Sequence, residues 1–479
     1  MPFLLRNLFP LSYNLTQLFN PMSIFSSKNV SRLTLVAALG YFVDVYDLLL
    51  FNVIKGDSLK DLGLAGIENE AALLNFQMFG MLLGGIMWGI LGDKKGRVTV
   101  LFGSILTYSI ANLANAFVVG FWDYALWRFI AGFGLAGELG AGVTLVSETM
   151  EKEKRGIGTM IIVSFGVLGA VVAVLVHEAL GWQNAFIVGG VMGLALLLLR
   201  AGALESGMFE GIKKSDAVNR GDFFHLITQD KTIRRIWEVL LPVSLLAFVL
   251  SFLLPAYSTL YRTIFGILGI GIVVQMVRDA RFRKYMYCIL LGMPIWFVIG
   301  ILVSFSNRFA VVTGVTGDIL VPTAVAFCYL GLSMGDFASG LLSQKLRSRK
   351  KAILAFLGLM TVVVLAFLFL RGLSPTVYYT LCFLLGFSAG YWAIFVQNAS
   401  EQFGTNLRST VTNTVPNFVR GGLVAMSAAF LALIPNPKVP DMYFIHSALI
   451  VGGVVIIIAL FSTWAIQETF SKDLDYVEE

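Results

Sequence analysis

The sequence predicts an all-α polytopic membrane protein of 14 transmembrane helices, built as two pseudo-symmetric six-helix bundles with an extra two-helix hairpin between them. Three observations support this class. The 479 residues are 57% hydrophobic and 13% charged, with a mean hydropathy of +0.81, which does not suit the exterior of a soluble protein. Long apolar runs recur along the chain, and pairs of short motifs repeat at a nearly constant offset.

Each apolar run is taken as a helix because about 20 helical residues span the roughly 30 Å hydrocarbon layer. The first half contains runs at 33–54, 73–92, 98–119, 123–147, 157–180 and 184–203. After a polar stretch come runs at 237–256 and 263–277, and the second half contains runs at 285–306, 319–342, 351–370, 376–399, 411–434 and 444–466. The predicted segments are a tail (1–30), a bundle (31–203), a cytoplasmic loop (204–235), a hairpin (236–280), a second bundle (281–467) and a tail (468–479).

The distribution of basic residues sets the predicted orientation. With the N-terminus inside, the inner segments carry 26 of the 35 Lys and Arg residues and the outer loops carry six, while Arg128, Arg200 and Arg420 fall within helices. Cytoplasmic loops are normally enriched in positive charge. We therefore expect both termini on the cytoplasmic side of a bacterial inner membrane.

The insert between the halves has basic residues on both flanks, at 231–235 and 278–284. Both flanks should therefore be cytoplasmic, which two crossings satisfy and one does not. The outer turn would lie near Pro255 to Tyr261. An interfacial hairpin is the alternative, since the second run is short and rich in glycine.

Several classes of protein are disfavoured by composition. The net charge of +6 comes from basic residues that are spread over the loops and form no single basic patch, which argues against nucleic-acid binding. Cys288, Cys328 and Cys382 lie inside apolar runs without metal-ligand spacing, so we expect them to pack as small apolar side chains. The three His residues are far apart and form no metal or catalytic cluster, so we expect no enzyme activity. The first 30 residues do not resemble a cleavable signal peptide.

An internal repeat relates the two halves. Glu148, followed seven residues later by Arg155, has its counterpart in Glu401 and Arg408, 253 residues further on. Two other pairs of landmarks agree within three residues: the Gly-Phe pairs at 132–133 and 386–387, and Gly89 with Gly340. Two parallel halves of this kind are typical of transporters whose substrate site lies between the halves near mid-membrane.

The stretch 89–97 resembles the loop motif of the major facilitator superfamily, Gly-x-Leu-x-Asp-(Arg/Lys)-x-Gly-Arg. Segments 40–47, 128–141 and 205–209 in the first half are similar to the metabolite:proton symporters of that superfamily. Two features depart from the symporter pattern: Gly207 stands where they usually have Pro, and the two extra central helices resemble those of proton-coupled peptide transporters. The resemblance implies a monomeric secondary transporter.

Ionisable side chains at bilayer depth are costly and usually functional. Asp47 and Arg128 lie at similar depths on their helices, and Asp44 is one turn deeper than Asp47 on the same face. A carboxylate that loses an Arg partner in a desolvated site gains affinity for a proton. Asp47 is therefore our main candidate for proton coupling, with Asp44, Arg128 and Glu138 as further candidates. Asp44 could instead carry the proton, and Asp47 with Arg128 could instead form a permanent structural tie.

Charges at the inner helix ends form a second candidate group, which we expect to act as a gate by exchanging partners. Its members are Gly89, Asp93, Arg97, Glu148, Arg155, Glu401 and Arg408. In the repeat Gln344 stands where Asp93 stands, so only the first-half loop carries the acidic contact. We expect Asp93 to contact the positive N-terminal end of a second-half helix.

Substrate recognition is assigned mainly to polar and aromatic residues of the second half. The candidates are Arg128, Gln77, Trp296, Tyr329, Asp336, Trp392, Gln397, Asn413, Asn417 and Arg420. Two cations, Arg128 and Arg420, favour an anionic or zwitterionic substrate. Any one aromatic residue could instead face lipid.

These features predict proton-coupled uptake of a small organic acid or zwitterionic metabolite by alternating access. The proton gradient would supply the energy without a cofactor, and the partners would be the substrate, protons and the lipid bilayer. The alternatives are a drug or metabolite proton antiporter, a facilitative exchanger and a membrane sensor that does not transport.

Overall fold

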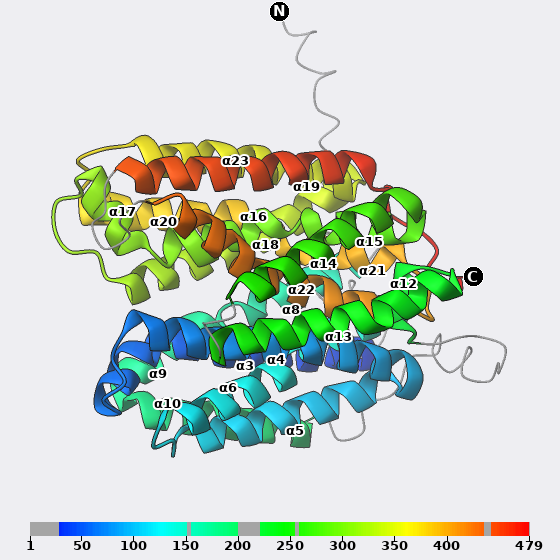
Figure 1. The fold of residues 1–479 in the computed structure, drawn as a ribbon, viewed down its shortest axis with the longest axis horizontal. Coiled ribbons are helices and arrows are strands. Elements are labelled where there is room, and N and C mark those ends of the chain that lie inside the picture. The colour runs from blue at the N-terminus through cyan, green and yellow to red at the C-terminus, as the bar shows by residue number, and fades with distance from the viewer. Residues whose placement is uncertain (1–27, 151–154, 200–220, 254–257, 435–441, 479) are drawn as a thin grey trace, which may run out of the picture.

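The computed structural model describes residues 28–150, 155–199, 221–253, 258–434 and 442–478, and the regular elements in these ranges are all helical (Figure 1). The first half contains α3 (Lys28–Asp61), α4 (Ile67–Lys95), α5 (Arg97–Asn115), α6 (Phe121–Leu135), α7 (Glu138–Thr149), α8 (Arg155–Gly166), α9 (Gly169–Leu180) and α10 (Trp182–Leu199). The predicted tail up to residue 27, the loop at 200–220 with the motif at 205–209, and the outer turn at 254–257 lie outside the described residues.

The middle of the chain contains α12 (Phe223–Ile227), α13 (Lys231–Leu253) and α14 (Ser258–Arg278). The second half contains α15 (Ala280–Leu290), α16 (Met293–Phe297), a π-helical segment (Val298–Val303), α17 (Ser306–Thr313), α18 (Val321–Leu346), α19 (Arg349–Phe369), α20 (Pro375–Ala389), α21 (Trp392–Gln402), α22 (Arg408–Ala432) and α23 (Met442–Ala465). Figure 1 shows the two halves as separate groups of roughly parallel helices, one below and one above.

Eleven helical segments of the described chain are long and apolar enough to cross a membrane. Ten of them match predicted runs closely, and the first continues beyond the predicted end at residue 54 to Asp61. The predicted run at 123–147 is not among the eleven; it forms two helices, α6 and α7, with a break between Leu135 and Glu138. The chain is thus an integral membrane protein of many apolar helices, while the total of 14 crossings stays a prediction.

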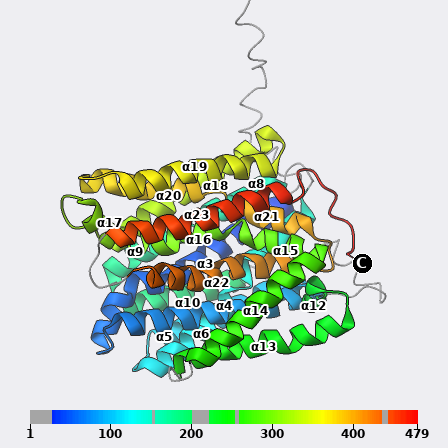
Figure 2. The same cartoon turned by 45° about the horizontal axis from the view of Figure 1, so that its top comes forward.

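Two helices, α13 and α14, occupy the region of the hairpin expected at 236–280 and lie at the periphery of the molecule (Figure 2). Neither is among the eleven candidate membrane spans of the described chain, so the transmembrane hairpin stays a prediction. The two helices are attached to the second half and to α12: the rings of Trp237 and Phe282 are 5.8 Å apart, and Gln275 Nε2 donates to the carbonyl of Ile227 at 2.7 Å. Ile236, Val239 and Ile270 expose more than half of their surface. This outward face suits contact with lipid.

Our expectation of uninterrupted helices is wrong at several places. Besides the break between α6 and α7, helix α8 ends at Gly166 before α9 begins, and α20 ends at Ala389 before α21 begins at Trp392. Two of these breaks are related by the repeat, since Leu135 and Glu138 lie 254 residues before Ala389 and Trp392. Backbone groups left unpaired by a break are tolerated at membrane depth where the break is buried in protein.

The repeat reappears in the packing of equivalent helices. A Cβ atom built on Gly80 or Gly84 of α4 would lie within 2.2 Å of a backbone oxygen of Phe129 or Phe133 in α6. In the second half Gly331 and Gly335 meet Phe383 and Phe387 in the same way, and Gly132 and Gly386 occupy matching positions on the opposite helices. Glycine at these crossings lets the two backbones touch.

Replacing Gly386 with Ala should destabilise the second half severely. The added methyl group would lie 1.8 Å from the carbonyl oxygen of Cys328, a backbone atom that moves only if α18 and α20 separate. We expect a loss of about 3 kcal/mol or more, at the upper end of overpacking effects. Gly358→Ala is the matched control, because nothing lies within 4 Å of that position. Equal melting temperatures of the two purified variants would contradict this packing.

Candidate functional site

A small cavity, with about 300 Å³ of atom-free space, lies between the two halves. The first half contributes Tyr41, Val45, Leu48 and Val167, and the second half contributes Ile295, Trp296, Ile299, Tyr329, Leu332, Trp392 and Arg420. The lining thus combines aromatic and aliphatic surface with a single guanidinium. Of the residues predicted for substrate binding, Trp296, Tyr329, Trp392 and Arg420 lie here.

Arg420 is held between aromatic rings in this cavity. Its guanidinium carbon is 5.5 Å from the ring centre of Trp392 and 6.0 Å from that of Trp296. One nitrogen, Nη1, donates to Asn417 Oδ1 at 3.1 Å, whereas Nε has no hydrogen-bond partner within the described part of the chain. A cation stacked on aromatic faces and only partly hydrogen-bonded can accept a carboxylate on its free edge.

Tyr41 and Asp336 fix the position of Trp392. The indole Nε1 of Trp392 donates to the hydroxyl oxygen of Tyr41 at 3.1 Å, a contact between the two halves. Asp336 on α18 accepts the backbone N–H of Ala393 at 2.8 Å, so it caps the first turn of α21 after the break. Asp336 therefore holds the first turn of α21, and with it Trp392, in the cavity wall.

A second buried polar cluster lies inside the first half around Arg128. The guanidinium donates to three amide oxygens, those of Asn112 at 3.2 Å, Asn115 at 3.3 Å and Gln77 at 3.5 Å. The rings of Phe186 and Phe51 lie at 4.9 and 5.7 Å from the guanidinium carbon. Gln77, predicted to bind substrate, is thus part of the shell that holds Arg128.

Asp47 lies beside this cluster, close enough to Arg128 for electrostatic interaction. Both touch α10 within one turn: a Cβ atom on Gly189 would be 2.2 Å from Asp47 Oδ1, and Arg128 lies over Phe186. Both Asp47 carboxylate oxygens are buried and make no hydrogen bond of normal geometry with the residues that the structure describes, and the side chain of Asn112 is the polar group that interacts with them. Asp47 and Arg128 thus interact electrostatically, while the guanidinium donates its hydrogen bonds among the described residues to neutral amides.

The other first-half acids are also buried. Asp44 lies on α3 one turn from Tyr41 and Asp47, and is fully inaccessible to solvent. Glu138 begins α7 directly after the break and has 1% of its surface exposed. Its position in the repeat corresponds to Trp392 at the start of α21.

The expected contact of Asp93 with a second-half helix is present at the inner end of the bundle. The carboxylate accepts the backbone N–H groups of Ser409 at 3.0 Å and Thr410 at 2.8 Å, and the hydroxyl of Thr410 at 2.7 Å. These residues form the first turn of α22, where unpaired N–H groups and the helix dipole favour a negative charge. Gly96, with φ of +109°, permits the sharp turn between α4 and α5 that keeps Asp93 in place.

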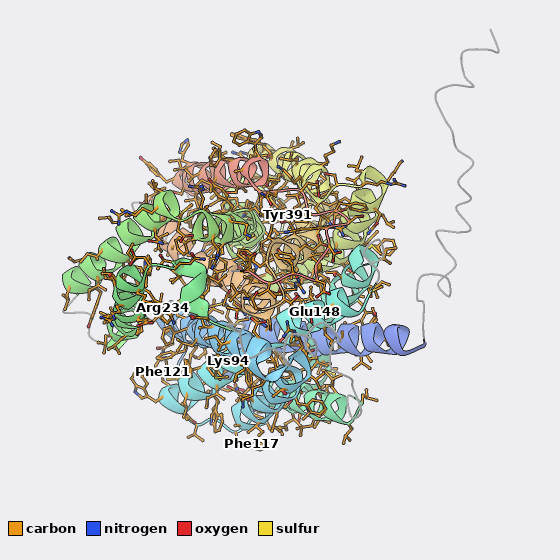
Figure 3. All side chains as sticks on the ribbon, turned by 90° about the vertical axis from the view of Figure 1, so that its right-hand side faces the viewer. Lys94, Phe117, Phe121, Glu148, Arg234 and Tyr391 are labelled. Atoms are coloured by element: carbon orange, nitrogen blue, oxygen red, sulfur yellow. The ribbon has the colours of Figure 1, made fainter. Side chains whose placement is uncertain are left out.

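Glu148 joins the same group, which we name the inner cluster: Asp93, Arg97, Glu148, Arg408, Ser409 and Thr410. Glu148 Oε1 accepts from Arg97 at 2.9 Å and from Arg408 at 3.0 Å, so one carboxylate bridges an arginine of each half. Arg97 also contacts Asp93 at 3.4 Å and donates to the carbonyl of Thr405 at 3.0 Å. Viewed from the inner end, Glu148 lies near the boundary between the halves (Figure 3).

The second half contains a similar pair, whose partners among the described side chains belong to that half. Glu401 accepts from Arg349 at 3.3 Å and from Gln397 at 2.6 Å. Arg349 lies 252 residues after Arg97, and Glu401 lies 253 residues after Glu148, so the pair is a repeat of Arg97 with Glu148. The side chain of Arg155, which would correspond to Arg408, lies outside the described residues.

The C-terminal segment covers the inner cluster. Thr405 N donates to the carbonyl of Tyr476 at 2.8 Å, Glu478 N donates to Asn406 Oδ1 at 2.9 Å, and Arg408 donates to the carbonyl of Leu474. Burial tends to raise the pKa of Glu468, but hydrogen bonds from Ser348 and from nearby backbone amides outweigh it and leave the pKa below its usual value. The ionised Glu468 thereby ties the segment to the start of α19.

Asn413, Asn417 and Gln397 were predicted to contact substrate but lie outside the cavity lining in this conformation. Asn413 donates to the carbonyl of Ser409 within α22, while Asn417 reaches the first half and donates to the carbonyl of Ala136 at 2.9 Å. Gln397 belongs to the Glu401 pair. Gly89 packs against the backbone of Thr410.

Sequence reasoning missed several residues of these sites. Arg349 could have been found from the sequence, because it lies 252 residues after Arg97, close to the offset of the repeat. Asn112 and Asn115 are also visible as polar residues on one face of an apolar helix, three positions apart. The contributions of Tyr41 and of the C-terminal segment depend on tertiary contacts without such a pattern.

The family model described as Major Facilitator Superfamily matches residues 37–418. A putative metabolite transport protein of Haemophilus influenzae is 31% identical over 210 residues, covering 42% of this chain and 51% of the relative. The niacin transporter NiaP of Acinetobacter baylyi is 34% identical over 168 residues, covering 34% and 38%. The chain thus aligns with about half or less of the length of these curated relatives.

A solved structure of the proton:xylose symporter XylE bound to 6-bromo-6-deoxy-D-glucose is similar in fold. Its TM-score is 0.60, with 17% sequence identity, over 94% of this chain and 98% of that chain. At this identity the likeness concerns the fold.

Proposed function

Because this chain belongs to the Major Facilitator Superfamily, we propose that it is a secondary active transporter, which takes up a small organic acid or zwitterion together with protons. The names of its relatives are those of transporters, which agrees with the prediction that the chain is not an enzyme. One observation carries the choice of substrate class: Arg420 lies in the cavity between the halves, stacked on two tryptophans and with Nε unpaired among the described residues.

The chemistry of the cavity favours a carboxylate attached to a compact apolar or aromatic body. Arg420 would bind the carboxylate through its free edge, and Trp296, Trp392 and Tyr329 would pack against the remainder of the molecule. Niacin, which the name of the Acinetobacter baylyi relative specifies, is a small aromatic carboxylic acid of this kind. It therefore serves as the first probe, in the form of nicotinate.

Asp47 provides the proton site in this proposal. An ionised carboxylate buried without a hydrogen-bond partner is costly, and protonation removes its charge. Arg128 lies nearby but is occupied by three amide oxygens, so its hold on Asp47 depends on how those amides are arranged. Movements of α3 relative to α10 would change the distance between Asp47 and Arg128, and with it the affinity for the proton.

The inner cluster acts as the gate on the cytoplasmic side. Asp93, Glu148 and Arg408 join the halves in this conformation, which is closed at the inner end. Release of these contacts lets the two halves rock apart and open the cavity inward, as alternating access requires. The proton gradient supplies the energy, without a bound cofactor, across a bacterial inner membrane with both termini in the cytoplasm.

Uptake of labelled nicotinate into proteoliposomes tests the proposal. We expect accumulation when the lumen is alkaline relative to the bath, collapse of accumulation on adding a protonophore, and loss of nicotinate binding in Arg420→Gln. Arg371→Gln is the matched control, since Arg371 donates to carbonyls of its own turn, away from the cavity. Uptake that is insensitive to the protonophore would indicate facilitated diffusion. Unchanged nicotinate binding in Arg420→Gln would exclude the assignment of the anion site.

A further inference from the structure

Asn417 connects the cavity arginine to the opposite half of the molecule. Its side-chain oxygen accepts Arg420 Nη1 at 3.1 Å, and its Nδ2 donates both to the carbonyl of Ala136 at 2.9 Å and to the carbonyl of Asn413 at 2.7 Å. Ala136 lies 281 residues away in the first half. The buried amide thus uses its oxygen and both of its N–H donors, so its orientation is fixed by three hydrogen bonds.

The first half offers a close and specific surface at this point. Ala136 belongs to the break between α6 and α7, and Gly85 and Gly140 face Asn417 and Asn413. A Cβ atom on Gly140 would lie 2.3 Å from Asn413 Oδ1, and one on Gly85 would lie 3.0 Å from Asn417 Nδ2. Because the backbones approach so closely, a small shift of Asn417 must move this contact between the halves.

We propose that Asn417 is a positioning residue that couples Arg420 to the contact between the halves: whether Arg420 is hydrogen-bonded to Asn417 determines how firmly Asn417 holds the carbonyl of Ala136. The inference rests on the proposed function, in which Arg420 receives the substrate anion. An anion on the free edge of Arg420 draws the guanidinium toward the cavity and away from Asn417 Oδ1. The amide then loses the partner that orients it, and its bond to Ala136 weakens, which favours separation of α22 from the first half.

A double-mutant cycle without substrate tests this link. The reporter is the thiol introduced by Ser409→Cys, because Ser409 is fully buried against Gly92 and becomes accessible only when the inner end opens. Maleimide labelling of this reporter thiol is followed by peptide mass spectrometry, which separates it from the buried native thiols of Cys288, Cys328 and Cys382. Labelling rates are compared for Arg420→Gln with and without Asn417→Ala.

We expect Arg420→Gln to raise the labelling rate at least about threefold when Asn417 is present and less than about 1.5-fold when Asn417 is replaced by Ala. If Arg420 and Asn417 stabilised the closed form independently, Arg420→Gln would change the labelling rate by the same factor with Asn417 and with Asn417→Ala. Equal ratios, or no effect of Arg420→Gln beside an intact Asn417, would overturn the proposal.

Asn417→Asp keeps an oxygen for Arg420 but has no N–H for the Ala136 carbonyl. It should behave like Asn417→Ala, and it carries the test if the Ala variant does not fold. If Arg420→Gln raises the labelling rate as much in the Asn417→Asp background as beside Asn417, the hydrogen bond to Ala136 does not couple Arg420 to the inner end. The control is Thr412→Val, which removes a hydroxyl that donates to the carbonyl of Arg408 in the same helix and should preserve the effect. Since no substrate is used, failure of nicotinate uptake is a separate result, which bears on the proposed function.

Discussion

Replacing Asp47 with Asn is expected to abolish proton-driven accumulation while leaving substrate exchange active. Asn has the shape of a protonated Asp but cannot release a proton, so the carrier can still move substrate down its gradient. The carboxylate of Asp47 is buried beside Arg128 and Asn112 and makes no hydrogen bond of normal geometry with the described residues. Ionisable groups in this situation within a membrane usually mark a proton pathway.

The measurement is nicotinate accumulation under a pH gradient, compared with counterflow of labelled against unlabelled nicotinate in the same proteoliposomes. The accumulation ratio of Asp47→Asn should fall to the equilibrium value, with counterflow retained. Asp44→Asn is the matched comparison, one turn away on α3 and equally buried. If Asp44→Asn loses accumulation and Asp47→Asn does not, the proton site moves to Asp44. If neither variant loses it, Asp47 and Arg128 are a structural tie.

Replacing Glu148 with Ala is expected to produce the largest loss of stability among the gate residues. Its carboxylate pairs with both Arg97 and Arg408, which are fully buried. Removing one partner of a buried ion pair costs about 3–5 kcal/mol because the remaining charge keeps its desolvation penalty. The two guanidiniums come from different halves, so their repulsion should also push the inner end open.

Glu401→Ala separates these two effects. Glu401 pairs with Arg349 and Gln397 of its own half, in the repeat of the Arg97 contact. We expect both variants to melt at lower temperature, but only Glu148→Ala should increase labelling of the reporter thiol in the Ser409→Cys background. Matching increases in the two variants would mean that loss of stability, and not loss of the bridge between halves, opens the inner end.

Much of the fold was predictable because long apolar runs can satisfy their backbone only as helices in a bilayer. The repeat was equally visible, since the glycines that permit the crossings of α4 with α6 and α18 with α20 recur at fixed offsets. The depth of Asp47 and Arg128 followed from counting residues along helices. The contact of Asp93 with α22 followed from the charge expected at a helix N-terminus.

Other features could not be read in this way. Interruptions at 135–138 and 389–392 lie against other helices, with Gly137 beside the side chains of Ser104 and Trp88 and Gly390 beside the backbone of Gly335. Asp336 looked like a cavity residue because it is a lone acid in an apolar run, but the break beside it turns it into a helix cap. Asn417 is one of several polar candidates in the sequence, and only its contacts with Ala136 and Arg420 distinguish it from the others.

The sequence alone therefore determined the class, the repeat and the set of buried charges, because hydrophobicity, spacing and the cost of charge in a membrane act along the chain. The tertiary structure decided which partners those charges have. Glu148 joins Arg97 to Arg408 across the boundary, whereas the partners of its repeat Glu401 among the described side chains, Arg349 and Gln397, belong to one half. Two related motifs thus differ in their described partners, since hydrogen bonds and ion pairs act over about 3 Å and depend on which helices meet.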